Sequence, residues 1–156
     1  TAKVGYTDAA VSANTDVAAN TLKGSYTQPI YTVNTFYAEL GGYVIQISPN
    51  GKQGVVVAMQ DQGISSRYGA NDLLSDASNH DADAKEFLDW RLPTKRELNL
   101  MYVVYSNGNG AFLNANVYWS FSEASSGSAT TQNFDGGNQS NFNKNDTYNV
   151  RAVRAF

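Results

Sequence analysis

The sequence contains no cysteine, which excludes a disulfide framework, a thiolate metal site and a cysteine nucleophile. It contains a single histidine, His80, so imidazole ligands for a transition metal are scarce. It also contains no run of about 18 apolar residues, the length that predicts a membrane-spanning helix. These absences remove several large classes of site before any motif is considered.

Charge is scarce as well. Charged residues make up 16% of the chain, the net charge is -3 and the sequence pI is about 5.0. Nucleic acids and anionic membranes are bound through basic patches, so we expect neither a nucleic-acid partner nor direct membrane insertion. The 42% hydrophobic share of 156 residues is enough for one domain with a core, while 13 glycines predict a loop-rich surface.

Motifs of common catalytic sites are missing. There is no Gly-x-Ser-x-Gly elbow and no Gly-x-x-x-x-Gly-Lys phosphate loop. His80 lies near Asp76, Asp81 and Asp83, a group that is either a cation site or a polar loop. Its spacing lacks the order of a calcium-binding loop, which favours the polar loop. We therefore predict no catalytic residue, no metal site and no cofactor.

The clearest local pattern is a β-hairpin. Two β-branched runs, 43–48 and 54–59, flank the sequence Pro-Asn-Gly-Lys. Asn50 and Gly51 both tolerate positive φ, which makes such a pair a strong turn signal between strands.

Helices are predicted in two places. Thr94 followed by Glu97 forms a capping box after Pro93, and apolar residues at helical spacing extend the helix over 95–105. A second, short helix is expected over 81–90, with Phe87, Leu88 and Trp90 facing inward.

Three more segments, 116–123, 128–134 and 149–156, have the composition of strands. The order of hairpin, helices and short strands predicts an α+β fold with short helices flanking small antiparallel sheets. The last strand is expected to pair inside a sheet, with Val150, Val153 and Phe156 in the core.

Three arginines lie in apolar contexts: Arg91, Arg151 and Arg154. They could form an anion clamp or pair with carboxylates near the core. Charges beside core strands usually need partners, so the structural interpretation is favoured, with Glu97 or Glu123 as candidate partners.

Residues 107–149 are rich in asparagine but interspersed with aromatic residues. A solvated loop or a disordered linker would explain the asparagines. Trp119, Phe121, Phe134, Phe142 and Tyr148 fit disorder poorly. Aromatic residues among Tyr, Ser, Gly and Asn are also the composition of an antibody-like contact surface.

The motifs "WRLPTKREL", "YWSFSE" and "VRAVRAF" resemble those of a bacterial domain family with a C-type lectin-like fold, which the formylglycine-generating enzymes share more widely. The resemblance covers 41–156 and implies a C-type lectin-like ligand-binding domain there. Residues 1–40 are then expected to form an N-terminal arm or extension packed on the domain.

The end of the chain is similar to the variable proteins of diversity-generating retroelements, a family that includes the phage major tropism determinant. In such systems adenines of a template are mutated. Changes at the two adenines of the Asn codon AAC yield every residue type except Gln, Lys, Glu, Met and Trp, and never a stop codon. The constant frame "YWSxSExxSxxAxxQNFxxGNQxxxxKxxTxxVRAVRAF" fits this chain without a gap, which implies a variable region at about 112–149.

The open positions of this frame all carry residue types that such mutation can reach, whereas Trp119, Glu123, Gln132, Gln139 and Lys144 fall on frame positions. The resemblance implies that the following open positions bind the ligand: Phe121, Ala124, Ser125, Gly127, Ser128, Thr131, Asp135, Gly136, Ser140, Asn141, Phe142, Asn143, Asn145, Asp146, Tyr148 and Asn149. Thr130 is also open in the frame.

The resemblance implies a hypervariable receptor-recognition protein, extracellular, on a phage tail or a bacterial cell surface. Its partner would be a protein or glycan on a target cell, and multivalent display would strengthen weak single-site binding. An invariant adhesin or carbohydrate-binding domain of the same fold is the alternative, with Ca²⁺ held by Asp76, Asp81 and Asp83. An enzyme of the formylglycine-generating type is disfavoured, because that chemistry depends on cysteines.

Overall fold

The computed structural model describes residues 28–110 and 113–156. Most of the predicted N-terminal arm, 1–27, lies outside the described residues. Within 28–40, β1 (Phe36–Tyr37) pairs with the strand that follows it, and η1 (Ala38–Leu40) is a single 3-10 turn.

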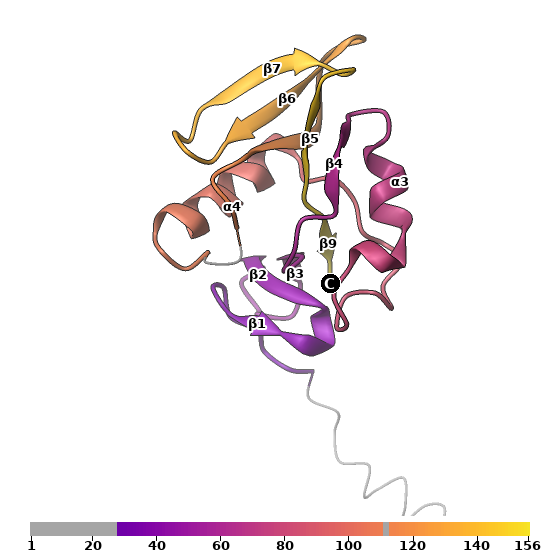
Figure 1. The fold of residues 1–156 in the computed structure, drawn as a ribbon. Coiled ribbons are helices and arrows are strands. Elements are labelled where there is room, and N and C mark those ends of the chain that lie inside the picture. Colours follow the sequence, from indigo (N-terminus) through magenta and orange to yellow (C-terminus); the bar gives the residue numbers. More distant parts are fainter. Residues whose placement is uncertain (1–27, 111–112) are drawn as a thin grey trace, which may run out of the picture.

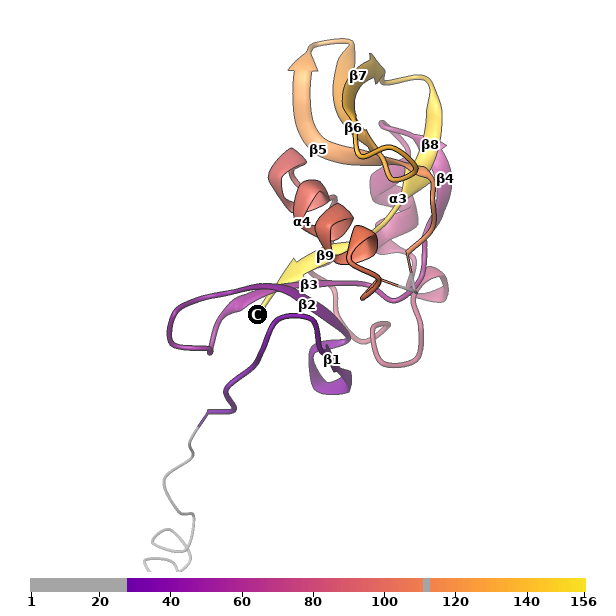
Figure 2. The same cartoon turned by 90° about the vertical axis from the view of Figure 1, so that its left-hand side faces the viewer.

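Two sheets form the domain (Figures 1 and 2). The four-stranded sheet has the order β1-β2-β3-β9, with β2 at Gly42–Ile47, β3 at Gly54–Val57 and β9 at Val153–Ala155. The five-stranded sheet has the order β4-β8-β5-β6-β7, with β4 at Gly63–Ser66, β8 at Thr147–Val150, β5 at Val117–Ser125, β6 at Ser128–Asn133 and β7 at Gln139–Asn143. Two short α-helices, α3 (Ala70–Ser75) and α4 (Lys95–Ser106), and the 3-10 turn η2 (Ala77–Asn79) complete the described elements. This mixed, loop-rich arrangement is a C-type lectin-like fold, as predicted.

The predicted hairpin is β2–β3, and its connection is longer than two residues. Ser48 N–H donates to Gln53 O, and Gly51 has φ +71°. The Asn50 side chain accepts from Lys52 N–H, so asparagine shapes the turn through its side chain while glycine supplies the positive φ.

Helix α4 begins at the predicted capping box. Thr94 Oγ1 accepts from Glu97 N–H, and the Glu97 carboxylate accepts from Thr94 N–H. Leu98, Met101 and Val104 are buried on its inner face. Figure 2 shows α4 between the two sheets. Its buried residues belong to a core cluster that includes Val57 of β3 and Tyr118 of β5.

The helix predicted over 81–90 is wrong, because this segment is a series of turns. The Asp81 carboxylate accepts from the backbone N–H groups of Asp83 and Ala84, and Trp90 Nε1 donates to Ala84 O. Leu88, expected to face inward, is 93% exposed. Ala84 and Lys85 N–H also donate to Asp81 O, and Phe87 N–H donates to Ala84 O, so separate turns form in place of a continuous helical ladder.

The final strand predicted over 149–156 is two strands in different sheets. β8 ends at Val150 in the five-stranded sheet, and β9 begins at Val153 in the four-stranded sheet. Arg151 between them is buried, with Nε 2.6 Å from Asp61 Oδ1 and Nη1 donating to Ala58 O. Val150 and Val153 are buried and Phe156 packs against the core, as predicted.

None of the helices in the part of the chain that the structure describes has both the length and the apolar character needed to span a lipid bilayer.

Candidate ligand-binding site

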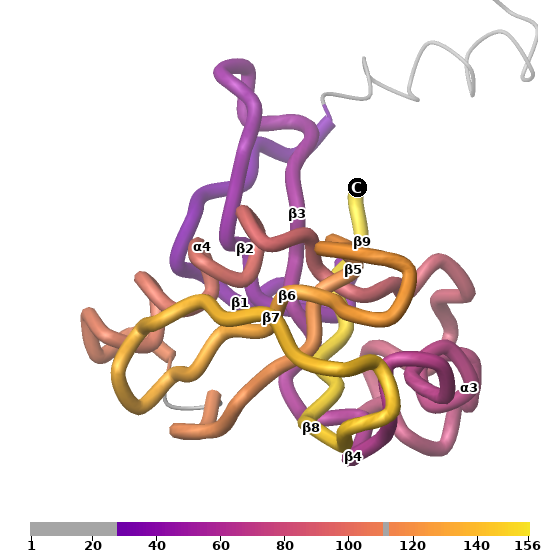
Figure 3. The backbone as a smooth tube through the Cα atoms, turned by 90° about the horizontal axis from the view of Figure 1, so that it is seen from above, coloured from indigo at the N-terminus to yellow at the C-terminus, as the bar shows by residue number. Residues whose placement is uncertain are grey.

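Strands β5 to β8 carry the predicted contact residues to one end of the molecule, which Figure 3 views from above. Most of these residues are exposed, and they are Phe121, Ala124, Ser125, Gly127, Asp135, Gly136, Ser140, Asn141, Phe142, Asn143, Asn145 and Asp146. Ser128, Tyr148 and Asn149 are half-buried. We call this set the diversity surface. Strands β5, β6, β7 and β8 thus account for much of the asparagine-rich stretch.

Two open positions do not reach this surface. Thr131, which the resemblance predicts to contact the ligand, is 1% exposed, and Thr130 is 8% exposed, so both side chains are buried. Thr131 lies between Trp119 on β5 and Ser140 on β7, in the middle of the sheet. Thr130 Oγ1 lies 3.0 Å from Asn141 Oδ1 on the neighbouring strand.

An aromatic row runs from the core to the diversity surface. The Tyr148 ring lies 5.1 Å from the ring of buried Trp119 and 5.0 Å from the ring of exposed Phe142. Trp119 is fixed by a hydrogen bond from Nε1 to Ser65 O. The half-buried Tyr148 therefore presents a rigid apolar contact area with little rotamer freedom left to lose on binding.

A buried lysine joins the turns of the diversity surface. Lys144 Nζ lies 2.6 Å from Glu123 Oε1 and donates to Ser126 O, while its backbone N–H donates to Gly127 O. The hydrogen bond from Lys144 holds the pKa of the Glu123 carboxyl below its usual value. Two frame residues thus tie the β5–β6 turn to the β7–β8 turn.

Two frame glutamines connect the sheet to α4. Gln139 Nε2 donates to Lys95 O and to Gln132 Oε1, and Gln132 Nε2 donates to Gly137 O. Gln132 is fully buried. The NH2 groups of both amides are thus engaged with the backbone and with each other.

The glycines of this end fall into two kinds. Gly137 has φ +76°, and a Cβ there would lie 2.5 Å from the Tyr102 ring, so only glycine fits. At Gly136 an added Cβ would meet only the Asn138 side chain at 3.7 Å, and at Gly127 nothing within 4 Å. Gly137, a frame position, is thus structurally required, whereas Gly127 and Gly136, which are open positions, are not.

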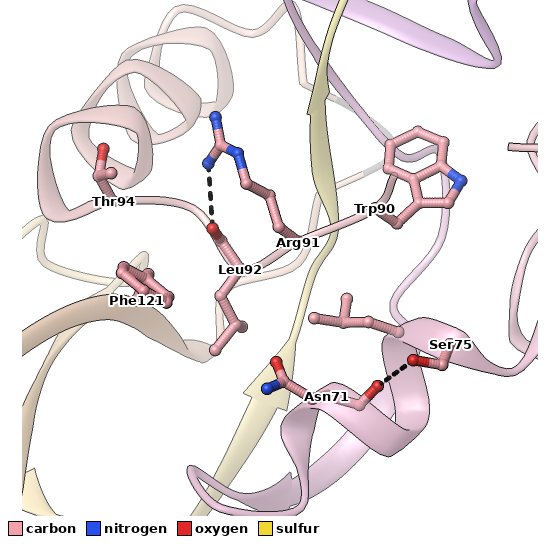
Figure 4. Close-up of a pocket in the computed structure, with 8 residues that line it drawn as sticks. Asn71, Ser75, Trp90, Arg91, Leu92, Thr94 and Phe121 are labelled. Atoms are coloured by element: carbon pink, nitrogen blue, oxygen red, sulfur yellow. Dashed lines mark hydrogen bonds between the residues drawn. The ribbon is translucent and has the colours of Figure 1, made fainter. Parts of the chain in front are cut away.

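Phe121 borders a cavity of about 490 Å³ below the diversity surface (Figure 4). Its floor is formed by Leu74, Trp90 and Leu92, which are buried. The Phe121 ring lies on the opposite side from Trp90 and is 59% exposed. The Arg67 guanidinium lies 5.5 Å from the Phe121 ring centroid. The cavity therefore combines a fixed apolar floor with a rim at an open position.

The three arginines have structural partners. Arg91 and Glu97 form two hydrogen bonds of 2.8 and 2.7 Å, which confirms one predicted partner. Burial alone would raise the pKa of Glu97, but hydrogen bonds from Arg91 and Thr94 outweigh it and hold the pKa below its usual value.

The other two arginines pair differently from the prediction. Arg151 pairs with Asp61, and Arg154 Nε lies 2.7 Å from Asp89 Oδ1. Glu123, the other predicted partner, pairs with Lys144.

The acidic group around His80 is built from local caps. The Asp76 carboxylate accepts from the backbone and hydroxyl of Ser78, which lowers the pKa of Asp76. The His80 ring stacks on Trp90 at 5.3 Å, and its Nε2 lies 2.9 Å from Leu74 O. Among residues 28–110 and 113–156, no group of three His, Cys, Asp or Glu residues is placed to hold a metal ion.

Sequence reasoning missed the contribution of β4 and the residues just after it. Tyr68 is 60% exposed, with its ring 5.8 Å from Lys144 Nζ, and Ile64 is 67% exposed opposite Asn149. Arg67 donates to the backbone of Ser120. These residues lie more than forty positions before the variable region, and no local pattern connects them to it.

The fold and this end of the molecule define the class of protein: a C-type lectin-like domain. The sequence matches the family described as the Lcl C-terminal domain over residues 58–154, more than half of the chain, and the protein belongs to this family. The family is associated with ligand-binding, tropism-determining variable proteins. No curated protein matches the chain.

Proposed function

We propose that the protein is a hypervariable receptor-recognition protein whose diversity surface binds the ligand. The observation that carries the proposal is the separation of frame and open positions. Frame residues such as Trp119, Gln132 and Lys144 are buried and hydrogen-bonded, whereas most open positions are exposed on one end. Exposed substitutions typically change stability by about 0.5 kcal/mol or less, so such a surface tolerates change.

The proposed activity is binding without catalysis. A protein or a glycan on a target cell is the proposed partner, and the proposed location is extracellular, on a phage tail or a bacterial cell surface. Support comes from the exposed aromatic and small polar side chains, which suit contact with many chemistries. Display in several copies would raise the avidity of a weak single site.

The DNA around the coding sequence tests the proposal directly. We expect a near-copy of the variable region with adenines at the open codons, and a reverse-transcriptase gene beside it. A neighbourhood with neither would remove the main support for diversification.

A combinatorial library offers a second test. One library randomises exposed open positions, and a matched library randomises the same number of buried frame positions. We expect most members of the first and few of the second to retain cooperative thermal unfolding. Equal loss of folding in both would contradict the proposed division.

An invariant adhesin or carbohydrate-binding domain is the second candidate. The burial of Thr130 and Thr131 favours it, because buried positions accept few substitutions. A glycan array, with and without Ca²⁺, separates the two candidates. Binding of one defined glycan, together with the absence of a template, would support the invariant domain.

A further inference from the structure

Strand β7 is the last strand of the five-stranded sheet, and within 28–110 and 113–156 it pairs only with β6. All of its residues, Gln139–Asn143, are exposed. One side of its backbone therefore faces solvent. An edge strand of this kind presents unpaired N–H and C=O groups that can accept another strand.

The register identifies these groups. Lys144 N–H donates to Gly127 O, and Asn133 N–H donates to Asn138 O, so both residue pairs are of the hydrogen-bonded kind. Because such pairs alternate along an antiparallel ladder, Ser140 and Phe142 direct their backbone groups toward β6.

The intervening residues Gln139, Asn141 and Asn143 direct theirs outward. The carbonyl of Asn143 accepts from Asp146 N–H. Within the described part of the chain, no hydrogen bond engages the outward N–H groups of the three residues or the carbonyls of Gln139 and Asn141.

The usual protections of an edge are missing from β7. The strand Gln-Ser-Asn-Phe-Asn contains no proline and no charged residue, which are common devices against pairing. The neighbouring Phe142 and Tyr148 rings lie 5.0 Å apart and offer apolar contact on one face of the sheet.

We propose that β7 binds an extended segment of a protein ligand by β-strand addition. Outward groups on alternate residues repeat at about 6.6 to 6.8 Å, the repeat of an extended peptide backbone. The ligand would supply the next strand, and the diversity surface would select among ligand side chains. This proposal rests on the proposed function in one respect, which is that a single edge strand serves many different protein ligands.

Diversification of the surface favours an extended peptide as the occupant of this edge over a glycan or a second copy of this chain. Substitutions at Ser140, Asn141, Phe142 and Asn143 change side chains but keep the main-chain N–H and C=O groups, except where proline enters. A glycan would depend on the side chains alone. A second copy of this chain would bury the same residues that are proposed to contact the ligand.

The test uses an mRNA-displayed library of random twelve-residue peptides, selected on the wild-type protein. Selected peptides are then measured on Asn141→Pro, which removes one outward N–H, and on Asn141→Ala, which keeps it. Proline is tolerated on an edge strand where its nitrogen faces solvent, and thermal unfolding checks that the variant folds. Each peptide is also made with N-methyl groups on alternate residues.

We expect Asn141→Pro to bind roughly five- to tenfold more weakly than Asn141→Ala, the effect of one lost backbone hydrogen bond, because both variants lack the asparagine side chain. N-methylation in one of the two alternate registers should abolish binding even if the proline variant fails to fold.

Equal binding by both variants and both N-methyl registers, or selection of no peptide, would overturn the proposal. Sedimentation that shows a wild-type dimer lost in Asn141→Pro would assign the edge to self-association instead. None of these outcomes depends on a nearby DNA template, so this proposal and the proposed function can fail separately.

Discussion

Lys144 Nζ lies 2.6 Å from Glu123 Oε1, although Glu123 lies on β5 and Lys144 lies in the turn between β7 and β8. The lysine side chain is 6% exposed and the glutamate side chain is 59% exposed. An ammonium group in so buried a position needs its partners, which are Glu123 and Ser126 O. Together with Ser126 O, the pair links the β5–β6 turn to the β7–β8 turn, where Gly127, Asn145 and Asp146 are open positions.

Replacing Lys144 with alanine should therefore lower the melting temperature by on the order of 5 °C, because buried packing and two hydrogen bonds are lost together. Lys52→Ala in the β2–β3 connection should leave it nearly unchanged, since that residue is exposed. Thermal unfolding by circular dichroism measures both. Similar melting temperatures for the two variants would contradict the role of Lys144.

Adjacent glycines make a matched pair. Gly137→Ala should reduce the free energy of unfolding by about 1 to 3 kcal/mol, because its φ is positive and the Tyr102 ring blocks a Cβ. Gly136→Ala should change it by less than about 0.5 kcal/mol. Urea denaturation of both variants checks this. The reverse ranking would mean that the turn between β6 and β7 is not built as described.

Thr131 and Ser140 face each other across β6 and β7 but differ in burial. Thr131→Tyr should destabilise the protein by about 1 to 3 kcal/mol through overpacking, whereas Ser140→Tyr should be nearly neutral. Denaturation curves compare the two. A neutral Thr131→Tyr would restore position 131 to the set of freely variable positions.

The Glu97 carboxyl has a folded-state pKa below its usual value of 4.5. A lowered pKa stabilises the folded state above the unfolded pKa, and the stabilisation is lost as the pH falls through the folded pKa. The stability difference between wild type and Glu97→Gln should thus be largest near pH 7 and shrink below about pH 4.5. Denaturation of both variants between pH 3 and pH 7 measures it, and a difference that does not change with pH would contradict the role of the ionised carboxylate.

Local chemistry made part of the fold predictable. The capping box at Thr94 and Glu97 and the turn at Gly51 are decided by neighbours in the sequence, and both are present. The helix predicted over 81–90 is absent: the Asp81 carboxylate accepts from Asp83 and Ala84 N–H at the start of a turn, and the segment continues as turns without a helical ladder. Strand β7 was missed because both of its faces are exposed, which leaves no apolar alternation to detect.

The sequence predicted the exposed residues of the candidate site better than it predicted which of its positions are buried. The frame placed Ser140 and Phe142 on the surface correctly, but Thr131 is buried by strands on both sides. Thr131 is buried because β6 lies between β5 and β7, and this order of strands in the sheet cannot be read from local sequence patterns. The partners Asp61 and Asp89 were equally out of reach, since each lies more than sixty residues from its arginine.

The division of the final run into β8 and β9 also constrains the order of folding. Strand β4 joins its sheet only through β8, which lies between β4 and β5, and β9 forms the last strand beside β3. During synthesis on the ribosome, neither sheet can be completed until residues 147–155 have left the exit tunnel. The hairpins can form early, but cooperative closure of the domain waits for this segment.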